Sequence, residues 1–121
     1  WFDAVVAKYS AAINGVDHWA ITKLDVLDEL ETIRIAVAYE CDGRRLDSVP
    51  ANLRQLARCK PVYEDMPGWS DSTVGATTYE ELPENARDYL ARIEELVATP
   101  IDIISTGPDR EQTIIKRDPF D

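Results

Sequence analysis

The chain has 121 residues, of which 45% are hydrophobic and 30% charged, and its formal net charge is −10. This composition predicts a single domain, or part of one, and the acidic balance argues against nucleic acids and anionic membranes as partners, because both need basic patches. No apolar run approaches the ~20 residues of a membrane span, and the sequence shows no secretory signal pattern.

A helix is the first element expected, over residues 2–14, with Gly15 as its C-cap. Its apolar positions recur at helical spacing and form one stripe: Phe2, Val5, Val6, Tyr9 and Ile13. The chain opens on Trp1 without an initiator methionine, and an apolar helix at this position suggests a segment of a longer protein. We therefore expect the helix to expose faces that the rest of that protein would cover.

The apolar run over 18–21 predicts a buried strand, and Thr22-Lys23-Leu24-Asp25 follows it. If the strand continues through Leu24, Lys23 and Asp25 share one face and Leu24 points into the core. A carboxylate there can accept from both N1–H and the exocyclic amine of guanine, a pair of donors that adenine lacks. The lysine methylenes can lie along the ring. An ordinary surface pair at a strand end is the alternative.

The clearest strand covers residues 32–41, which are β-branched and partly alternating, and Asp42-Gly43 closes it with a hairpin signal. The patterns around this hairpin predict, in chain order, an acidic turn or short helix over 26–31, a returning strand over 44–49, a short helix over 51–59, a strand over 61–66 and a polar loop over 69–78. Trp69 is expected to anchor that loop, and a place on a partner surface is the alternative.

A second long helix is expected from about residue 83, with Pro83 near its first position, and Pro100 stops it. Its apolar stripe is Ala86, Tyr89, Leu90, Ile93, Leu96 and Val97. Strands over 101–104 and 113–115 follow, before an Asp118-Pro119 turn. Helices alternating with strands, plus one hairpin, predict an α/β fold over residues 1–121, with a mixed sheet and flanking helices.

Ser105-Thr106-Gly107 follows the strand over 101–104 directly. Ligands of open α/β sheets bind beyond the carboxyl ends of strands, so this turn and residues 22–25 would share one rim if their strands are parallel. Exposed N–H groups of such a turn can donate to a carbonyl oxygen such as guanine O6, and glycine allows close approach. A plain turn before Pro108 is the alternative.

Other kinds of site find little support in the sequence. The five glycines fit neither G-x-x-x-x-G-K-[ST] nor G-x-G-x-x-G, so a triphosphate and its Mg²⁺ would have to be held elsewhere. His18, the single histidine, is expected to be held by hydrogen bonds rather than to act as a base. Cys41 and Cys59 lack metal-ligand spacing, and we expect two free thiols in a reducing compartment.

Short motifs along the chain resemble the carboxyl-terminal part of adenylosuccinate synthetase, and they keep the same order. The motifs are Trp1-Phe2-Asp3-Ala4, Thr22-Lys23-Leu24-Asp25-Val26-Leu27-Asp28, Val37-Ala38-Tyr39, Pro61-Val62-Tyr63-Glu64, Met66-Pro67-Gly68-Trp69, Leu82-Pro83-Glu84-Asn85-Ala86, Arg92-Ile93-Glu94-Glu95-Leu96, Gly107-Pro108-Asp109-Arg110 and Arg117-Asp118-Pro119-Phe120. Collinear matches over the whole chain are more specific than any single motif.

The resemblance implies part of a cytoplasmic, homodimeric, Mg²⁺-dependent ligase that joins IMP and L-aspartate, driven by GTP hydrolysis through 6-phosphoryl-IMP. It implies guanine-binding residues in two turns: Lys23, Leu24 and Asp25, then Ser105, Thr106 and Gly107. The first turn is similar to the N-K-x-D of GTPases, but Thr22 replaces the asparagine, whose role is not carried over.

The same resemblance places the catalytic, IMP-binding, phosphate-binding and metal-binding residues upstream of Trp1, so the segment alone is expected to be inactive. Two other hypotheses stay open. The chain could be a free-standing, non-catalytic guanine-nucleotide-binding module, or a structural domain in which both turns are incidental.

Overall fold

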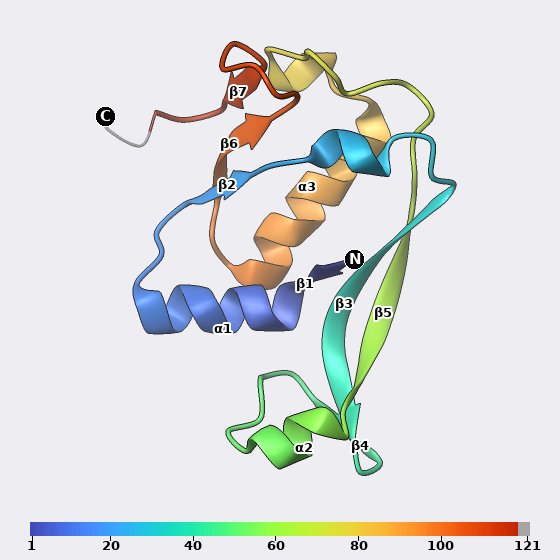
Figure 1. Cartoon of the computed structure of the whole chain (residues 1–121), viewed down its shortest axis with the longest axis vertical. Helices are drawn as coiled ribbons and strands as arrows, with labels where there is room; N and C mark the ends of the chain where they lie inside the picture. The colour runs from blue at the N-terminus through green and yellow to red at the C-terminus, as the bar shows by residue number, and fades with distance from the viewer. Residues whose placement is uncertain (119–121) are drawn as a thin grey trace.

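The computed structural model describes residues 1–118, and the expected Asp118-Pro119 turn lies partly outside them. The elements, in chain order, are β1 (Phe2–Asp3), α1 (Ala4–Asn14), β2 (Trp19–Ile21), the 3₁₀ helix η1 (Leu24–Leu27), β3 (Thr32–Cys41), β4 (Arg44–Leu46), α2 (Leu53–Ala57), β5 (Lys60–Pro67), the 3₁₀ helix η2 (Tyr79–Glu81), α3 (Glu84–Val97), β6 (Ile101–Ser105) and β7 (Thr113–Ile115). The α/β prediction is confirmed, but the strands form two mixed sheets instead of one (Figure 1).

β3 is the centre of the first sheet. β1 runs parallel to it, with Phe2 opposite Ile35, while β4 and β5 run antiparallel to it. The expected hairpin is confirmed, because Asp42 and Gly43 have φ values of 53° and 79°, as a two-residue turn between antiparallel strands requires. The returning strand is shorter than expected and ends at Leu46.

The second sheet consists of β2, β6 and β7. β2 and β6 are parallel, with Ile21 opposite Ile104, and β7 pairs antiparallel with β6. The carboxyl ends of β2 and β6 therefore lie at the same edge of this sheet. That arrangement was the condition for the two predicted turns to meet.

Helix α3 lies between the two sheets in Figure 1. One buried cluster joins side chains of α3 to isoleucines of both sheets, including Ile35 of β3 and Ile104 of β6. The expected stripe of α3 is confirmed, since five of its residues are buried: Ala86, Tyr89, Leu90, Ile93 and Val97. A helix with one apolar face thus supplies the shared core.

Helix α1 differs from the expectation in its start and in its packing face. The structure places residues 2–3 in β1, and the Asp3 carboxylate accepts from the first backbone N–H groups of the helix, at 3.0 and 3.1 Å. Of the predicted stripe, three residues are 46–60% exposed: Val6, Tyr9 and Ile13. Val5 is the stripe residue of the helix that is buried, and the helix packs through it together with Ala4 and Ala11, because small side chains allow its backbone to approach its neighbours closely.

Cys41 and Cys59 form a disulfide, with their Cα atoms 4.3 Å apart, so the expectation of two free thiols is wrong. The β3–β5 ladder pairs Glu40 with Lys60. The two cysteines, one step further along the paired chains, therefore face each other across the end of the ribbon. Sequence spacing alone does not reveal such a cross-strand neighbour.

Candidate functional site

The candidate site is the sheet edge where β2 and β6 both end. Ile21 and Ile104 are the last paired residues of this parallel ladder. Thr22 and Ser105, which come next on the two chains, begin the turns that the sequence analysis singled out. The structure therefore brings the two predicted turns to one edge, as ligand sites of α/β sheets require.

In the first turn, the chain leaves β2 earlier than expected. The strand ends at Ile21, and Lys23 adopts a left-handed conformation with φ 59° and ψ 35° before η1 begins. Leu24 is 2% exposed and does point into the core, although the turn puts it there, not the alternation of a continued strand. Lys23 is exposed and Asp25 is half-buried. A non-glycine residue at positive φ is uncommon and is held there by its surroundings.

In the second turn, Thr106 is fully buried at 0% exposure. Its N–H donates to the backbone oxygen of Gln112 at 2.8 Å, and its hydroxyl donates to the backbone oxygen of Ala76 at 2.7 Å. The polar groups of Thr106 are thus bonded inside the protein. Its partly exposed neighbours Ser105 and Gly107 form the outer part of the turn.

Gly107 packs closely against the side chain of Gln112. A Cβ atom built on it would lie 2.2 Å from Oε1 of Gln112, and that oxygen accepts from the backbone N–H of Asp109 at 3.0 Å. Ser105 donates its hydroxyl to the backbone oxygen of Gly107 at 3.1 Å. The turn is therefore compact, and a larger residue at 107 would displace Gln112.

A depression of ≈ 440 Å³ opens beside the first turn. It is lined mostly by apolar side chains of β2, η1 and α3, and Lys23 is its one charged lining residue. The indole nitrogen of Trp19 is buried in this region without a hydrogen-bond partner. The depression offers a flat ligand an apolar wall and one cation, whereas Asp25 and the Ser105–Gly107 turn are not among its lining residues.

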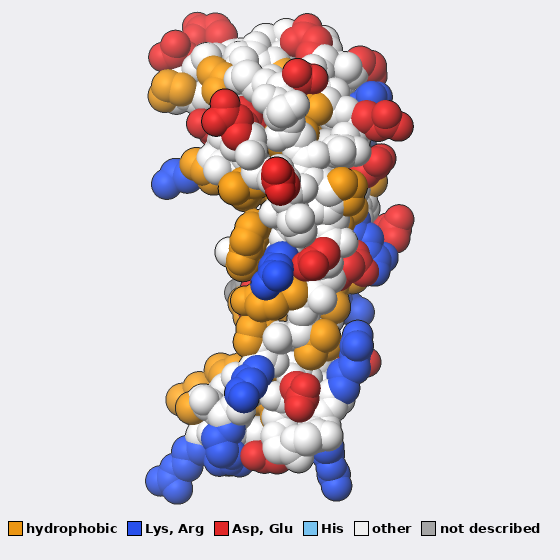
Figure 2. Space-filling view, turned by 90° about the vertical axis from the view of Figure 1, so that its right-hand side faces the viewer, with side chains coloured by type: hydrophobic (Ala, Val, Ile, Leu, Met, Phe, Trp, Pro, Cys, Tyr) orange, Lys and Arg blue, Asp and Glu red, His pale blue; other side chains and the backbone are white. Residues whose placement is uncertain are grey.

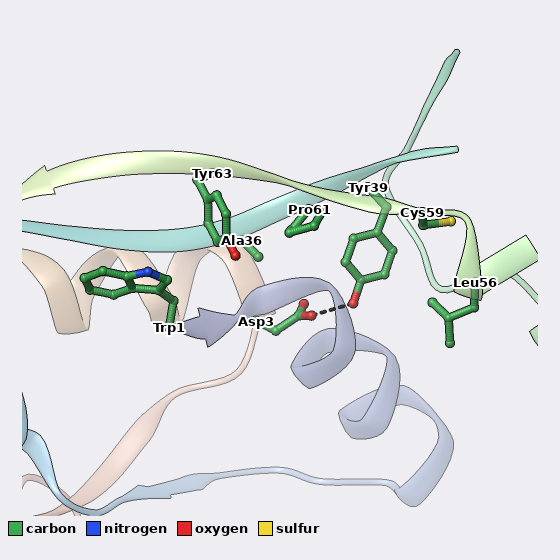
Figure 3. Close-up of a pocket in the computed structure, with 8 residues that line it drawn as sticks. All are labelled: Trp1, Asp3, Ala36, Tyr39, Leu56, Cys59, Pro61 and Tyr63. Carbon is green, nitrogen blue, oxygen red and sulfur yellow. Dashed lines mark hydrogen bonds between the residues drawn. The ribbon is translucent and has the colours of Figure 1, made fainter. Parts of the chain in front are cut away.

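A second depression, of ≈ 270 Å³, lies on the first sheet (Figure 3), and no residue of the two turns lines it. The Tyr39 hydroxyl donates to the Asp3 carboxylate there. Burial, and then the hydrogen bond to Asp3, raise the pKa of Tyr39 above its ordinary value. Since Asp3 also caps α1, its carboxylate is already bonded within the protein.

His18 lies at the opposite edge of the second sheet, just before β2. Its Nδ1 is 2.6 Å from a carboxylate oxygen of Asp102, whose side chain is 4% exposed. The histidine thus lies against a buried carboxylate, at the end of β2 away from the two turns. Among residues 1–118, no three His, Cys, Asp or Glu side chains gather as metal ligands would, and no helix is long and apolar enough to cross a membrane.

Sequence reasoning gave no role to Asp28 or Thr73. The Asp28 carboxylate accepts three donors from the loop after β5, including the Trp69 indole at 2.6 Å. Asp28 stands three residues after Asp25 in the quoted motif, but no local spacing indicates contacts with residues more than 40 positions away. The expectation that Trp69 anchors its loop is confirmed by this bond.

In α/β folds with loops at the carboxyl ends of parallel strands, those loops are where ligands bind, and enzymes of several classes share this architecture. The profile of the family described as adenylosuccinate synthetase matches residues 1–114, and the chain belongs to this family. The resemblance noted in the sequence is thus confirmed.

Named relatives and a solved structure agree with this assignment. Adenylosuccinate synthetase of Halorhodospira halophila is 56% identical over 120 residues, and that of Herminiimonas arsenicoxydans is 57% identical; each match covers 99% of this chain and 28% of the relative. The structure of fully ligated adenylosuccinate synthetase from Plasmodium falciparum superposes with a TM-score of 0.90 at 36% identity, over 97% of this chain and 28% of that one. The chain therefore spans little more than a quarter of the proteins it matches.

Proposed function

We propose that this chain is the guanine-recognising, carboxyl-terminal segment of an adenylosuccinate synthetase, a ligase that joins IMP and L-aspartate at the expense of GTP. One observation carries the proposal: parallel pairing of β2 and β6 brings the Lys23–Asp25 turn and the Ser105–Gly107 turn to one sheet edge. The family membership of residues 1–114 supports the same role.

In this proposal Asp25 selects the purine. Its carboxylate accepts from N1–H and from the exocyclic amine of guanine, and hydrogen bonds to a charged acceptor contribute about 1.5–3 kcal/mol each. Adenine offers an unprotonated N1 at the same place, so its complex would leave the half-buried carboxylate facing a lone pair. A site whose polar groups form hydrogen bonds with one ligand rejects an analogue that lacks the matching donors, because the polar groups of the site are then left unpaired.

The other residues of the two turns complete the contact. The methylene stem of Lys23, which is exposed beside the apolar depression, lies along the ring. The backbone N–H of Gly107, in the outer part of the second turn, reaches O6, and Thr106, whose own N–H is bonded to Gln112, lies beneath it. Leu24 fixes the first turn by its burial.

The reaction itself is assigned to the rest of the enzyme. Transfer of the GTP γ-phosphoryl group to IMP and attack by L-aspartate need a phosphate loop and acid–base groups, and the 121 residues contain no phosphate-loop motif. Mg²⁺ would neutralise charge on the transferred phosphoryl group, but residues 1–118 hold no cluster of ligands that fits it. The complete enzyme is proposed to be a cytoplasmic homodimer, and the segment alone to be inactive.

Kinetics of the complete enzyme test this proposal. Asp25→Ala should raise the KM for GTP by at least about tenfold, because two charge-assisted bonds are lost, while the KM for IMP stays nearly unchanged. Glu31→Ala removes an exposed carboxylate a few residues away and serves as the matched control. Unaltered GTP kinetics in the Asp25 variant would refute the assignment.

A further inference from the structure

One loop of the structure contacts the elements that carry both proposed guanine turns. This loop, residues 69–76, joins β5 to η2 and is here called the bridge loop. At one end it is bonded to Asp28, the residue that closes η1. At the other end it is bonded to Thr106, in the turn after β6.

The first contact is a carboxylate that gathers several donors of the bridge loop. Oδ1 of Asp28 accepts from the Trp69 indole at 2.6 Å and from the Thr73 hydroxyl at 3.0 Å, and Oδ2 accepts from the Thr73 backbone N–H at 2.9 Å. Trp69 is 5% exposed and Thr73 is 0% exposed. Donors buried this deeply are left unsatisfied if the acceptor is lost, which makes the arrangement rigid.

Asp28 is also joined to the residue proposed to select guanine. Its backbone N–H donates to the backbone oxygen of Asp25 at 3.1 Å, which closes the single turn of η1. The side chain and main chain of one residue therefore tie η1 to the bridge loop. The bridge loop and the turn that carries Asp25 are therefore linked through one residue.

The second contact ties the far end of the bridge loop to Thr106. The Gly75 N–H donates to the backbone oxygen of Thr106 at 3.1 Å, and the Thr106 hydroxyl donates to the backbone oxygen of Ala76 at 2.7 Å. Gly75 has φ 81°, a conformation that favours glycine. Thr106 is fully buried, so these bonds fix the base of the turn whose outer residues are Ser105 and Gly107.

We propose that Asp28 and Thr73 are positioning residues for guanine recognition, which hold the bridge loop so that the two guanine turns keep one separation. This inference rests on the proposed function. Guanine N1, its exocyclic amine and O6 lie on one edge of a rigid ring, so acceptor and donor must be spaced to match them. Binding groups held to within about 0.5 Å by buried supporting contacts are what such recognition requires.

The test uses the complete enzyme and four variants at the residues that bond the bridge loop to the two turns. Asp28→Asn replaces one carboxylate oxygen, which accepts a hydrogen bond from the bridge loop, by an amide N–H₂ group, which cannot accept one. Thr73→Val removes the hydroxyl at nearly constant volume. Thr106→Val acts at the opposite end, and Thr73→Ser restores the hydroxyl. Asp71→Asn makes the same chemical change as Asp28→Asn at an exposed position of the same loop and is the matched control.

We expect Asp28→Asn, Thr73→Val and Thr106→Val each to raise the KM for GTP by about three- to thirtyfold. The KM values for IMP and L-aspartate and the kcat should stay within about twofold. The preference for GTP over ITP, which lacks the exocyclic amine, should fall as well. Thr73→Ser should restore both values, and Asp71→Asn should change neither.

The outcomes separate this inference from the proposed function. Suppose that Asp25→Ala raises the KM for GTP. If Asp28→Asn, Thr73→Val and Thr106→Val then leave this KM unchanged, or alter GTP and IMP kinetics equally, the bridge loop does not position the turns and the inference is overturned. If Asp25→Ala itself has no effect, the proposed function fails and the inference with it. Should Asp28→Asn not fold, comparison of Thr73→Val with Thr73→Ser decides by the same kinetic measurements.

Discussion

The two ends of the molecule are stabilised in different ways. At the edge beyond β2 and β6, buried polar groups such as Thr73 and Thr106 are bonded to fixed partners. At the β4–α2 end, where Figure 2 shows basic side chains gathering, the contacts are a disulfide, a small apolar cluster and exposed ion pairs such as Arg58–Asp42.

This difference shows which end is suited to precise recognition. A buried hydrogen bond costs free energy if its geometry is lost, whereas an exposed ion pair is screened by water and contributes little. The end beyond β2 and β6 is therefore held in one geometry, and the β4–α2 end tolerates substitution of its exposed residues. The following predictions test this contrast.

The largest difference is expected between two leucines. Leu24→Ala removes a side chain that is 2% exposed and should lower the free energy of unfolding by about 2–5 kcal/mol. Leu53→Ala in α2, where the side chain is 80% exposed, should change it by less than about 0.5 kcal/mol. Denaturant unfolding of both variants measures this, and equal losses would contradict the contrast.

The disulfide should have the next largest effect, on stability alone. It closes a loop between residues 18 positions apart, which predicts about 3 kcal/mol of stabilisation. Cys59→Ser, or a reductant added to the unchanged protein, should lower the thermal midpoint and leave GTP affinity unaltered. A midpoint that does not respond to reductant would contradict the pairing, and a change in GTP affinity would contradict the independence of the two ends.

A smaller effect, with a defined pH dependence, is expected from Glu64. The hydrogen bonds from Arg92, at 2.7 and 2.8 Å, lower the pKa of Glu64 more than partial burial raises it. A lowered folded-state pKa stabilises the protein above the unfolded pKa, and this contribution is lost as pH falls through the folded value.

Glu64→Gln should therefore cost about 0.5–1 kcal/mol near neutral pH and less in acid. Thermal midpoints measured from pH 7 to pH 3 test this. Asp65→Asn is the control, because it removes the charge of an ion pair, Arg34–Asp65, that is more exposed than the Glu64–Arg92 pair. An equal loss at every pH would show that packing, not charge, accounts for the effect.

The smallest effect is expected for Arg58→Ala. Arg58 and Asp42 are both more than half exposed, so water already solvates both charges. No measurable change in the thermal midpoint is expected. A loss as large as that of Glu64→Gln would mean that the β4–α2 end depends on this pair.

Much of the fold was predictable because periodic patterns act locally. The strand over 32–41, its Asp42-Gly43 turn and the buried stripe of α3 follow from side-chain alternation and helical spacing. The face of α1 was not predictable, because an apolar stripe does not show which of its sides a neighbouring element covers.

The site was predictable only in part, for the same reason. The two turns stand out as polar residues after short apolar strands, and parallel pairing then brings them together. The early end of β2 depends on the left-handed backbone of Lys23, which residue preference disfavours. The bonds of Asp28 to Trp69 and Thr73, like the Cys41–Cys59 pair, join residues far apart in the chain, and such contacts arise only from the tertiary fold.

The most direct measurement is a nucleotide titration of the complete enzyme. If the two turns bind the guanine edge, GTP should bind at least about a hundredfold more tightly than ATP, because ATP lacks the two donors that pair with Asp25. Asp25→Ala should remove most of that preference. Equal affinities for GTP and ATP in the unaltered protein would contradict the account.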